Sequence, residues 1–60
     1  MNKKWHWYVY IIECSDGLFY TGVTWNVDKR MEQHKSGKGS KFTSKHGFKR
    51  LLFEEQSDEN

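Results

Sequence analysis

The chain has 60 residues, which is enough for one small domain, and its net charge at pH 7 is only +2. Its single cysteine excludes an internal disulfide, and no apolar stretch approaches the roughly 20 residues that a membrane span requires. A lone thiol, no secretory signal and no span predict a cytoplasmic protein without a membrane partner.

The first expected element is a strand over residues 5–14, which is rich in Trp, Tyr, Val and Ile. It is apolar without alternation from 7 to 12, so we expect both of its faces to be covered. The turn-forming residues Ser15, Asp16 and Gly17 follow, and residues 18–23 form the second strand of a hairpin.

The length of this turn decides where the two tyrosines of the hairpin point. A two-residue turn would send Tyr10 and Tyr20 to opposite faces of the sheet. A three-residue loop with Gly17 in the left-handed conformation instead pairs Ile12 with Tyr20 and Tyr10 with Gly22. Both turns are chemically allowed, and we predict the three-residue loop, which places the two tyrosines on one face.

A helix is expected over residues 27–35, with Asn26 as its N-cap and Gly37 as its C-cap. A further helical turn over 42–46 and a third strand over 50–55 complete the pattern. This order predicts an α+β fold, in which the hairpin and the third strand form a small sheet with the main helix on one side.

A single domain is expected over residues 1–60, with its core at about 5–55 and a frayed tail over 56–60. Because so short a chain buries little surface, its stability must come from an aromatic-rich core, from self-association, or from a segment outside these residues. We expect Cys14 to be a small packed side chain, and Gly22 to be required by backbone geometry. The cysteine and the three histidines match no usual zinc-ligand spacing.

Positive charge is concentrated in the second half of the chain. Between Gln33 and Phe53 there is no acidic residue, whereas this stretch carries Lys35, Lys38, Lys41, Lys45, Lys49 and Arg50. A block of one sign is typical of a phosphate-binding surface. The alternative is an ordinary solvated, lysine-rich loop.

Five short blocks in this order resemble the GIY-YIG nuclease superfamily. They are Tyr8-Val9-Tyr10, Tyr20-Thr21-Gly22, the helix sequence NVDKRMEQH, the loop sequence SGKGSKFT and the strand sequence LLFEE. The resemblance is strongest to the small single-domain branch related to the N-terminal nuclease module of the UvrC repair enzyme. It implies a three-stranded antiparallel sheet flanked by helices, and metal-dependent hydrolysis of DNA.

The resemblance also implies roles for particular residues. Tyr10 stands at the position of the proton-accepting tyrosine, Tyr20 at the second motif tyrosine, and Arg30 at the helix arginine that stabilises the phosphate. His34 falls where an active-site histidine or tyrosine is often found, and Glu54 at the carboxylate that holds Mg²⁺ or Mn²⁺. The DNA-binding side chains would be those of Lys29, Lys35, Lys38, Lys41, Lys45 and Lys49.

The chemistry of these residue types is consistent with such roles. A tyrosine with its usual pKa of about 10 acts as a base only if cations lower that pKa or if it relays its proton onward. The permanent charge and planar fork of Arg30 suit phosphate oxygens. Mg²⁺ prefers one or two carboxylates, with water and phosphate as its other ligands, so one carboxylate is enough.

Taken singly, each residue also has an ordinary structural interpretation: a strand aromatic, a solvated charge or a helix cap. Two whole-chain alternatives to a nuclease acting on structured or damaged DNA also stand. One is a DNA-binding module without turnover, which would use the basic block with Trp25 and Phe42 as stacking surfaces. The other is a vestigial or protein-interaction fragment.

Members of the family usually continue into a further basic helix, so a homodimer or a missing C-terminal segment is also expected.

Overall fold

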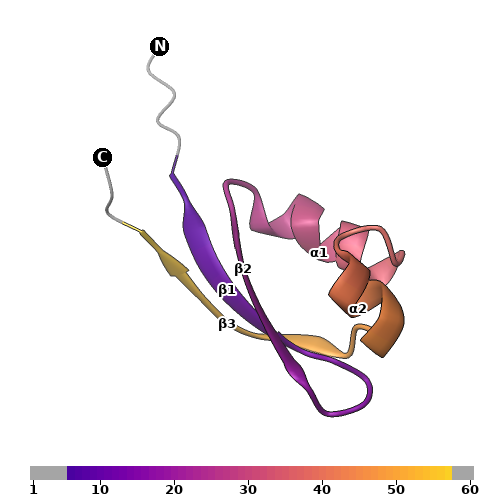
Figure 1. Cartoon of the computed structure of the whole chain (residues 1–60). Helices are drawn as coiled ribbons and strands as arrows, with labels where there is room; N and C mark the ends of the chain where they lie inside the picture. Colours follow the sequence, from indigo (N-terminus) through magenta and orange to yellow (C-terminus); the bar gives the residue numbers. More distant parts are fainter. Residues whose placement is uncertain (1–5, 58–60) are drawn as a thin grey trace.

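The computed structural model describes residues 6–57 and shows the elements in the expected order (Figure 1). The strands are β1 (Tyr8–Glu13), β2 (Phe19–Thr24) and β3 (Arg50–Gln56), and the helices are α1 (Val27–Lys35) and α2 (Lys41–His46). The strands form one antiparallel sheet in the order β2-β1-β3. This confirms the expected α+β fold.

The hairpin has the three-residue loop that the turn chemistry predicts. Ile12 pairs with Tyr20 and Tyr10 pairs with Gly22, so both tyrosines point to the same face. Gly17 has φ of +92°, in the left-handed region that glycine enters without steric cost. Its N–H donates to the carbonyl of Cys14 at 3.0 Å, which closes the turn.

Five strand boundaries differ from those expected: β1 is Tyr8–Glu13 and not 5–14, β2 is Phe19–Thr24 and not 18–23, and β3 ends at Gln56 and not at 55. β1 begins at Tyr8 because its partner on one side, β2, ends opposite it at Thr24, where the chain turns into α1. Residue 5 lies outside the described residues. Gln56, expected in a frayed tail, belongs to β3 and pairs with Tyr8. Residues 58–60 of that tail also lie outside the described residues.

Local capping sets the ends of both helices. The side chain of Asn26 accepts a hydrogen bond from the N–H of Lys29 at 3.0 Å, as expected of the N-cap of α1. The C-cap is Ser36, one residue before Gly37, because the next two N–H groups donate back to the last carbonyls of the helix. α2 begins one residue earlier than predicted because Ser40 caps it through the N–H of Thr43.

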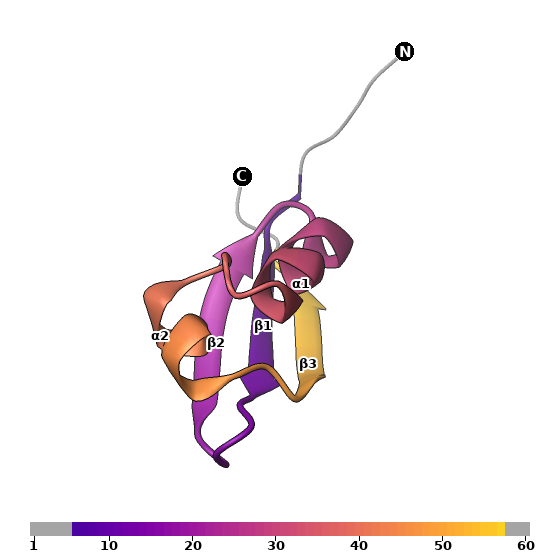
Figure 2. The same cartoon turned by 90° about the vertical axis from the view of Figure 1, so that its right-hand side faces the viewer.

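Both helices lie against one face of the sheet, with α2 beside β2 (Figure 2). The core between them contains Tyr10, Ile12 and Met31, and the partly buried hydrophobic residues packed on it are Tyr20, Val27, Phe48 and Leu51. Aromatic side chains therefore form much of this core. Cys14 is fully buried, as expected of a packed side chain, and burial raises the pKa of its thiol.

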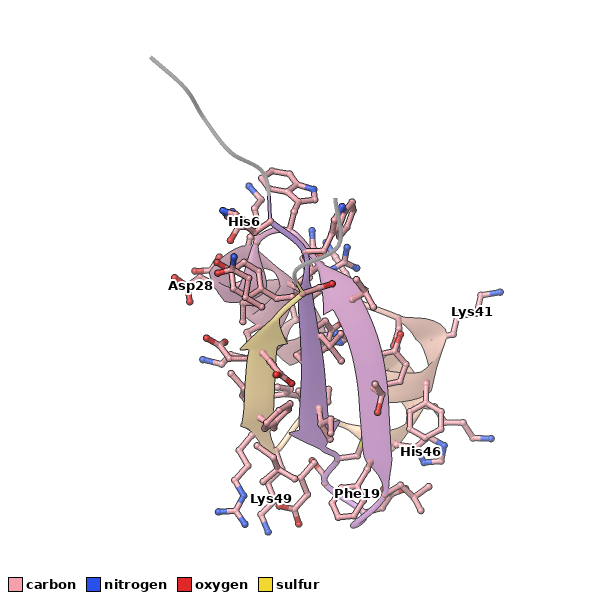
Figure 3. All side chains as sticks on the ribbon, turned by 90° about the vertical axis from the view of Figure 1, so that its left-hand side faces the viewer. His6, Phe19, Asp28, Lys41, His46 and Lys49 are labelled. Carbon is pink, nitrogen blue, oxygen red and sulfur yellow. The ribbon has the colours of Figure 1, made fainter. Side chains whose placement is uncertain are left out.

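The opposite face of the sheet is not covered by the described residues, so the expectation that both faces are covered is wrong for this part of the chain. Figure 3 looks onto this face, where no helix lies in front of the strands. Val23 and Phe53 are 56% and 46% exposed. The reason is topological: both helices lie on one side of the sheet, the side on which Tyr10 contacts His34 of α1. In residues 6–57 no helix is long and apolar enough to span a bilayer.

Candidate active site

The centre of the site is a contact between β1 and α1. Tyr10 Oη and His34 Nε2 share a hydrogen bond of 2.9 Å, although 24 residues separate them in the chain. Tyr10 is 2% exposed and His34 1%, so water hardly competes for this bond. The side chains meet because Tyr10 faces the helices and His34 lies on the inward side of α1.

Gly22 and Gly39 leave the space that these two rings occupy. A Cβ atom on Gly22 would collide with the hydroxyl of Tyr10, and one on Gly39 would lie 2.5 Å from Nδ1 of His34. The φ angle of Gly22 is not positive. The glycine is therefore required by the close approach of a phenol, and not by backbone geometry as the sequence suggested.

Tyr20 lies beside this pair on the same face of the sheet. Its ring centroid is 6.4 Å from that of Tyr10 and 5.5 Å from the imidazole of His34. Phe42 of α2 stacks on it at 5.6 Å. Tyr20 remains partly exposed, whereas Tyr10 is not. The two tyrosines thus share a face but differ in access to solvent.

Arg30 stands one helical turn before His34 on α1 and acts on both buried rings. Its guanidinium donates to the carbonyl oxygen of Gly39 at 3.4 Å. Burial raises the pKa of Tyr10, and the nearby Tyr20 adds to this, while the charge of Arg30 opposes it. Burial and then the charge of Arg30 lower the pKa of His34. At neutral pH the pair is therefore a neutral phenol and a neutral imidazole.

Glu54 lies directly opposite Tyr10 across the β1–β3 ladder, so its Cβ points to the same face. It is exposed and lines a hollow of about 280 Å³ together with Tyr8, Asn26 and Asp28. An adjoining hollow of about 140 Å³ is lined by Arg30 and Lys29, and the two hollows share Asn26. The predicted acid and arginine therefore border one region of the surface.

The oxygen ligands in the larger hollow fit a hard, hydrated dication. Two carboxylates, those of Glu54 and Asp28, line it, and Mg²⁺ commonly takes one or two protein carboxylates. Within residues 6–57 no three His, Cys, Asp or Glu side chains are grouped to hold a metal. Water and substrate phosphate would therefore supply most of the ligands.

The predicted DNA-binding lysines separate into distinct places. Lys38, Lys41 and Lys45 line one hollow of about 390 Å³ between the α1–α2 loop and α2, together with serine hydroxyls. Lys49 lies 3.8 Å from a carboxylate oxygen of Glu13, at another corner of the molecule from Lys41 (Figure 3). Lys35 is exposed in the last turn of α1.

Sequence reasoning missed Ser40 and Thr43. Thr43 is 1% exposed, and its Oγ1 lies 2.7 Å from Nδ1 of His34 and 2.9 Å from Oγ of Ser40. The capping role of Ser40 could have been predicted from the serine that precedes the helical turn. The contact between Thr43 and His34 could not, because it depends on how α2 packs against α1.

Comparison with known proteins decides the family. The family described as GIY-YIG catalytic domain matches residues 6–60, nearly the whole chain. The chain belongs to the GIY-YIG family. The match includes all of the described part of the chain, residues 6–57.

The GIY-YIG chain is also similar to small curated proteins called UPF0213. It is 56% identical over 45 residues to one from Halalkalibacterium halodurans, covering 75% of this chain and 48% of that relative. It is 46% identical over 43 residues to one from Cupriavidus pinatubonensis, covering 72% and 48%. The chain therefore spans about half the length of these relatives. No solved structure matches it, and the comparisons give no support to a homodimer.

Proposed function

We propose that this chain is a metal-dependent endonuclease that hydrolyses DNA phosphodiesters, preferentially at structured or damaged sites. The observation that carries the proposal is the buried 2.9 Å hydrogen bond between Tyr10 and His34. A neutral imidazole bonded to a neutral phenol can accept a proton from it, and that transfer is what a tyrosine needs in order to act as a base near neutral pH.

In the proposed reaction the oxygen of a water molecule attacks phosphorus and forms a new P–O bond. The bond from phosphorus to the sugar oxygen of the leaving strand breaks, and that oxygen takes a proton from solvent water. One proton of the attacking water passes to the phenolic oxygen of Tyr10, while the original phenolic proton passes to Nε2 of His34. Because Tyr10 is 2% exposed, this step requires that DNA binding bring the water molecule to the phenol. The raised pKa of Tyr10 makes prior ionisation unfavourable, so the two transfers are coupled. Positioned acid–base groups of this kind contribute about 10²- to 10⁴-fold in rate.

The remaining groups act on the phosphate. Arg30 offers a permanently charged fork to the phosphoryl oxygens as negative charge develops on them. Tyr20, which is partly exposed beside the buried pair, would contact the same phosphate. Glu54, with Asp28 in the same hollow, would hold the divalent ion. When bound, the ion supplies positive charge that stabilises the departing oxygen.

The basic hollow lined by Lys38, Lys41 and Lys45 is proposed to hold the DNA backbone, with Lys29 beside Arg30 and Lys35 adding positive charge on the helix side. Lys49 contributes less, because Glu13 lies beside it. Such contacts supply affinity and register without reading sequence.

Cleavage of labelled branched DNA with Mg²⁺, and with EDTA as the control, tests the proposal. We expect metal-dependent products from the wild type and a loss of rate of about 10²-fold or more in Glu54→Gln. The matched control is Glu55→Gln, which changes the neighbouring carboxylate on the opposite side of β3 and should cleave normally. Equal effects of the two substitutions would reject the metal role of Glu54.

A second candidate is a DNA-binding module without turnover. The hollow with three lysines favours it, because that hollow could bind phosphate without any chemistry at Tyr10. Binding of branched DNA without cleavage at any Mg²⁺ or Mn²⁺ concentration would select this alternative for the 60-residue chain.

A further inference from the structure

The hydrogen bond between Tyr10 and His34 is the first link of a longer chain of side chains. Nδ1 of His34 lies 2.7 Å from Oγ1 of Thr43, which lies 2.9 Å from Oγ of Ser40. Tyr10, His34 and Thr43 are all at least 98% buried. The chain leads from the sheet through α1 to the start of α2, and it ends at a serine that lines the basic hollow.

The direction of these bonds follows from counting protons. Suppose that His34 carried its proton on Nε2 and donated it to Tyr10. The hydroxyl proton of Tyr10 would then have no acceptor among residues 6–57, in a position that water hardly reaches. A buried donor without an acceptor is strongly disfavoured.

The other tautomer gives every buried proton an acceptor. Tyr10 donates to Nε2 of His34, and Nδ1–H of His34 donates to Oγ1 of Thr43. The hydroxyl of Thr43 then donates to Oγ of Ser40. Only the proton of Ser40, which is partly exposed, is left for solvent.

The orientation of the ring is also restricted by its neighbours. Phe48 stacks on the imidazole of His34 with an interplanar angle of 7°. The backbone of Gly39 lies so close to the imidazole that a Cβ there would be 2.5 Å from Nδ1. A flipped ring would exchange Nδ1 with Cδ2 and Nε2 with Cε1, and would lose the bonds to both Thr43 and Tyr10.

We propose that Thr43 is a positioning residue that holds His34 in the Nδ1-protonated tautomer, leaving Nε2 free to accept the proton of Tyr10. The place of Thr43 in the reaction rests on the function proposed above. The effect of Thr43 on the tautomer of His34 does not depend on that function, and it can be measured without any cleavage assay.

The direct test is nitrogen NMR of the histidine rings in ¹⁵N-labelled protein near pH 7.5. We expect His34 to be protonated on Nδ1 in the wild type and in Thr43→Ser, which keeps the hydroxyl. In Thr43→Val, Nδ1 loses its acceptor, so the Nε2-protonated form should become populated. Thr21→Val is the matched control: it makes the same change on the open face of the sheet and should leave the tautomer unaltered.

An Nε2-protonated His34 in the wild type would overturn the tautomer assignment. An unchanged Nδ1-protonated ring in Thr43→Val would overturn the role of Thr43 in holding it. A backbone amide spectrum confirms that each variant is folded. If Thr43→Val does not fold, Thr43→Ala, which also lacks the hydroxyl, takes its place in the comparison with Thr43→Ser.

The kinetic test measures single-turnover cleavage in the same variants. Thr43→Val should slow cleavage by about 10- to 100-fold, which is less than losing an acid–base group outright, while DNA affinity stays within about twofold. Thr43→Ser should restore most of the rate. A changed tautomer with an unchanged rate would remove Thr43 from the reaction. Absence of cleavage in the wild type would instead be a failure of the proposed function, and the NMR result would stand alone.

Discussion

At the scale of single residues, the site depends on a histidine held neutral. His34 is 1% exposed and lies near the charge of Arg30, and both effects lower its pKa. Its pKa in the unfolded chain is about 6.5. Between the folded value and 6.5, the unfolded chain binds more protons, so acidification favours unfolding.

We therefore expect the free energy of unfolding to fall as the pH is lowered from 7.5 to 5.5, by at most about 1.4 kcal/mol per pH unit for this one group. Urea unfolding of the wild type and of His34→Gln at several pH values measures this change in the free energy of unfolding. The pH dependence should be weaker in the variant, which lacks the imidazole. Thr21→Val, which changes no titratable group, is the control and should keep the wild-type dependence. If wild type and His34→Gln respond equally to pH, His34 is not held neutral by the fold.

At the scale of elements, α2 and the preceding loop determine what surrounds the buried pair. The hairpin loop is joined to the end of α2 by a 2.5 Å contact between Asp16 and His46, which lowers the pKa of Asp16. The N–H of Ser15 also donates to the carbonyl of His46 at 3.1 Å. These contacts hold α2 in place, and with it the hydroxyl of Thr43 and the lysines of the basic hollow.

The basic hollow gives a prediction at this scale. Lys45→Gln should weaken binding to short duplex DNA and lower the slope of log K against log salt by about 0.9, because one phosphate contact is lost. Lys49→Gln is the matched control. Because Glu13 lies beside Lys49, we expect this substitution to change the slope less than Lys45→Gln does. Equal slopes for wild type and Lys45→Gln would remove the hollow from the DNA surface.

Element-scale features also show what the sequence could and could not predict. The hairpin register follows from Ser15-Asp16-Gly17, because a left-handed glycine after a tight turn permits few pairings. Helix α1 follows from the cap at Asn26. Which lysines gather, and which hydroxyl meets His34, depends on the packing of α2 on the sheet, which no local pattern encodes.

At the scale of the whole molecule, the sheet has two unlike faces. One carries the helices, the core and the proposed site, whereas the other exposes apolar side chains such as Val23 and Phe53 in the described residues. The sequence suggested cover on both faces because β1 lacks an alternating pattern. An alternation of apolar and polar residues distinguishes the two faces of a strand only when the exposed face carries polar side chains. The exposed face of this sheet carries apolar side chains instead.

The central claim at this scale is that the fold brings a buried phenol and imidazole together for phosphodiester hydrolysis. Single-turnover cleavage of branched DNA with saturating Mg²⁺, compared between wild type and Tyr10→Phe, tests it most directly. Tyr10→Phe keeps the aromatic ring and its packing but removes the hydroxyl. We predict a fall in rate of at least about 10²-fold with little change in DNA affinity. Cleavage by Tyr10→Phe at the wild-type rate would contradict the account.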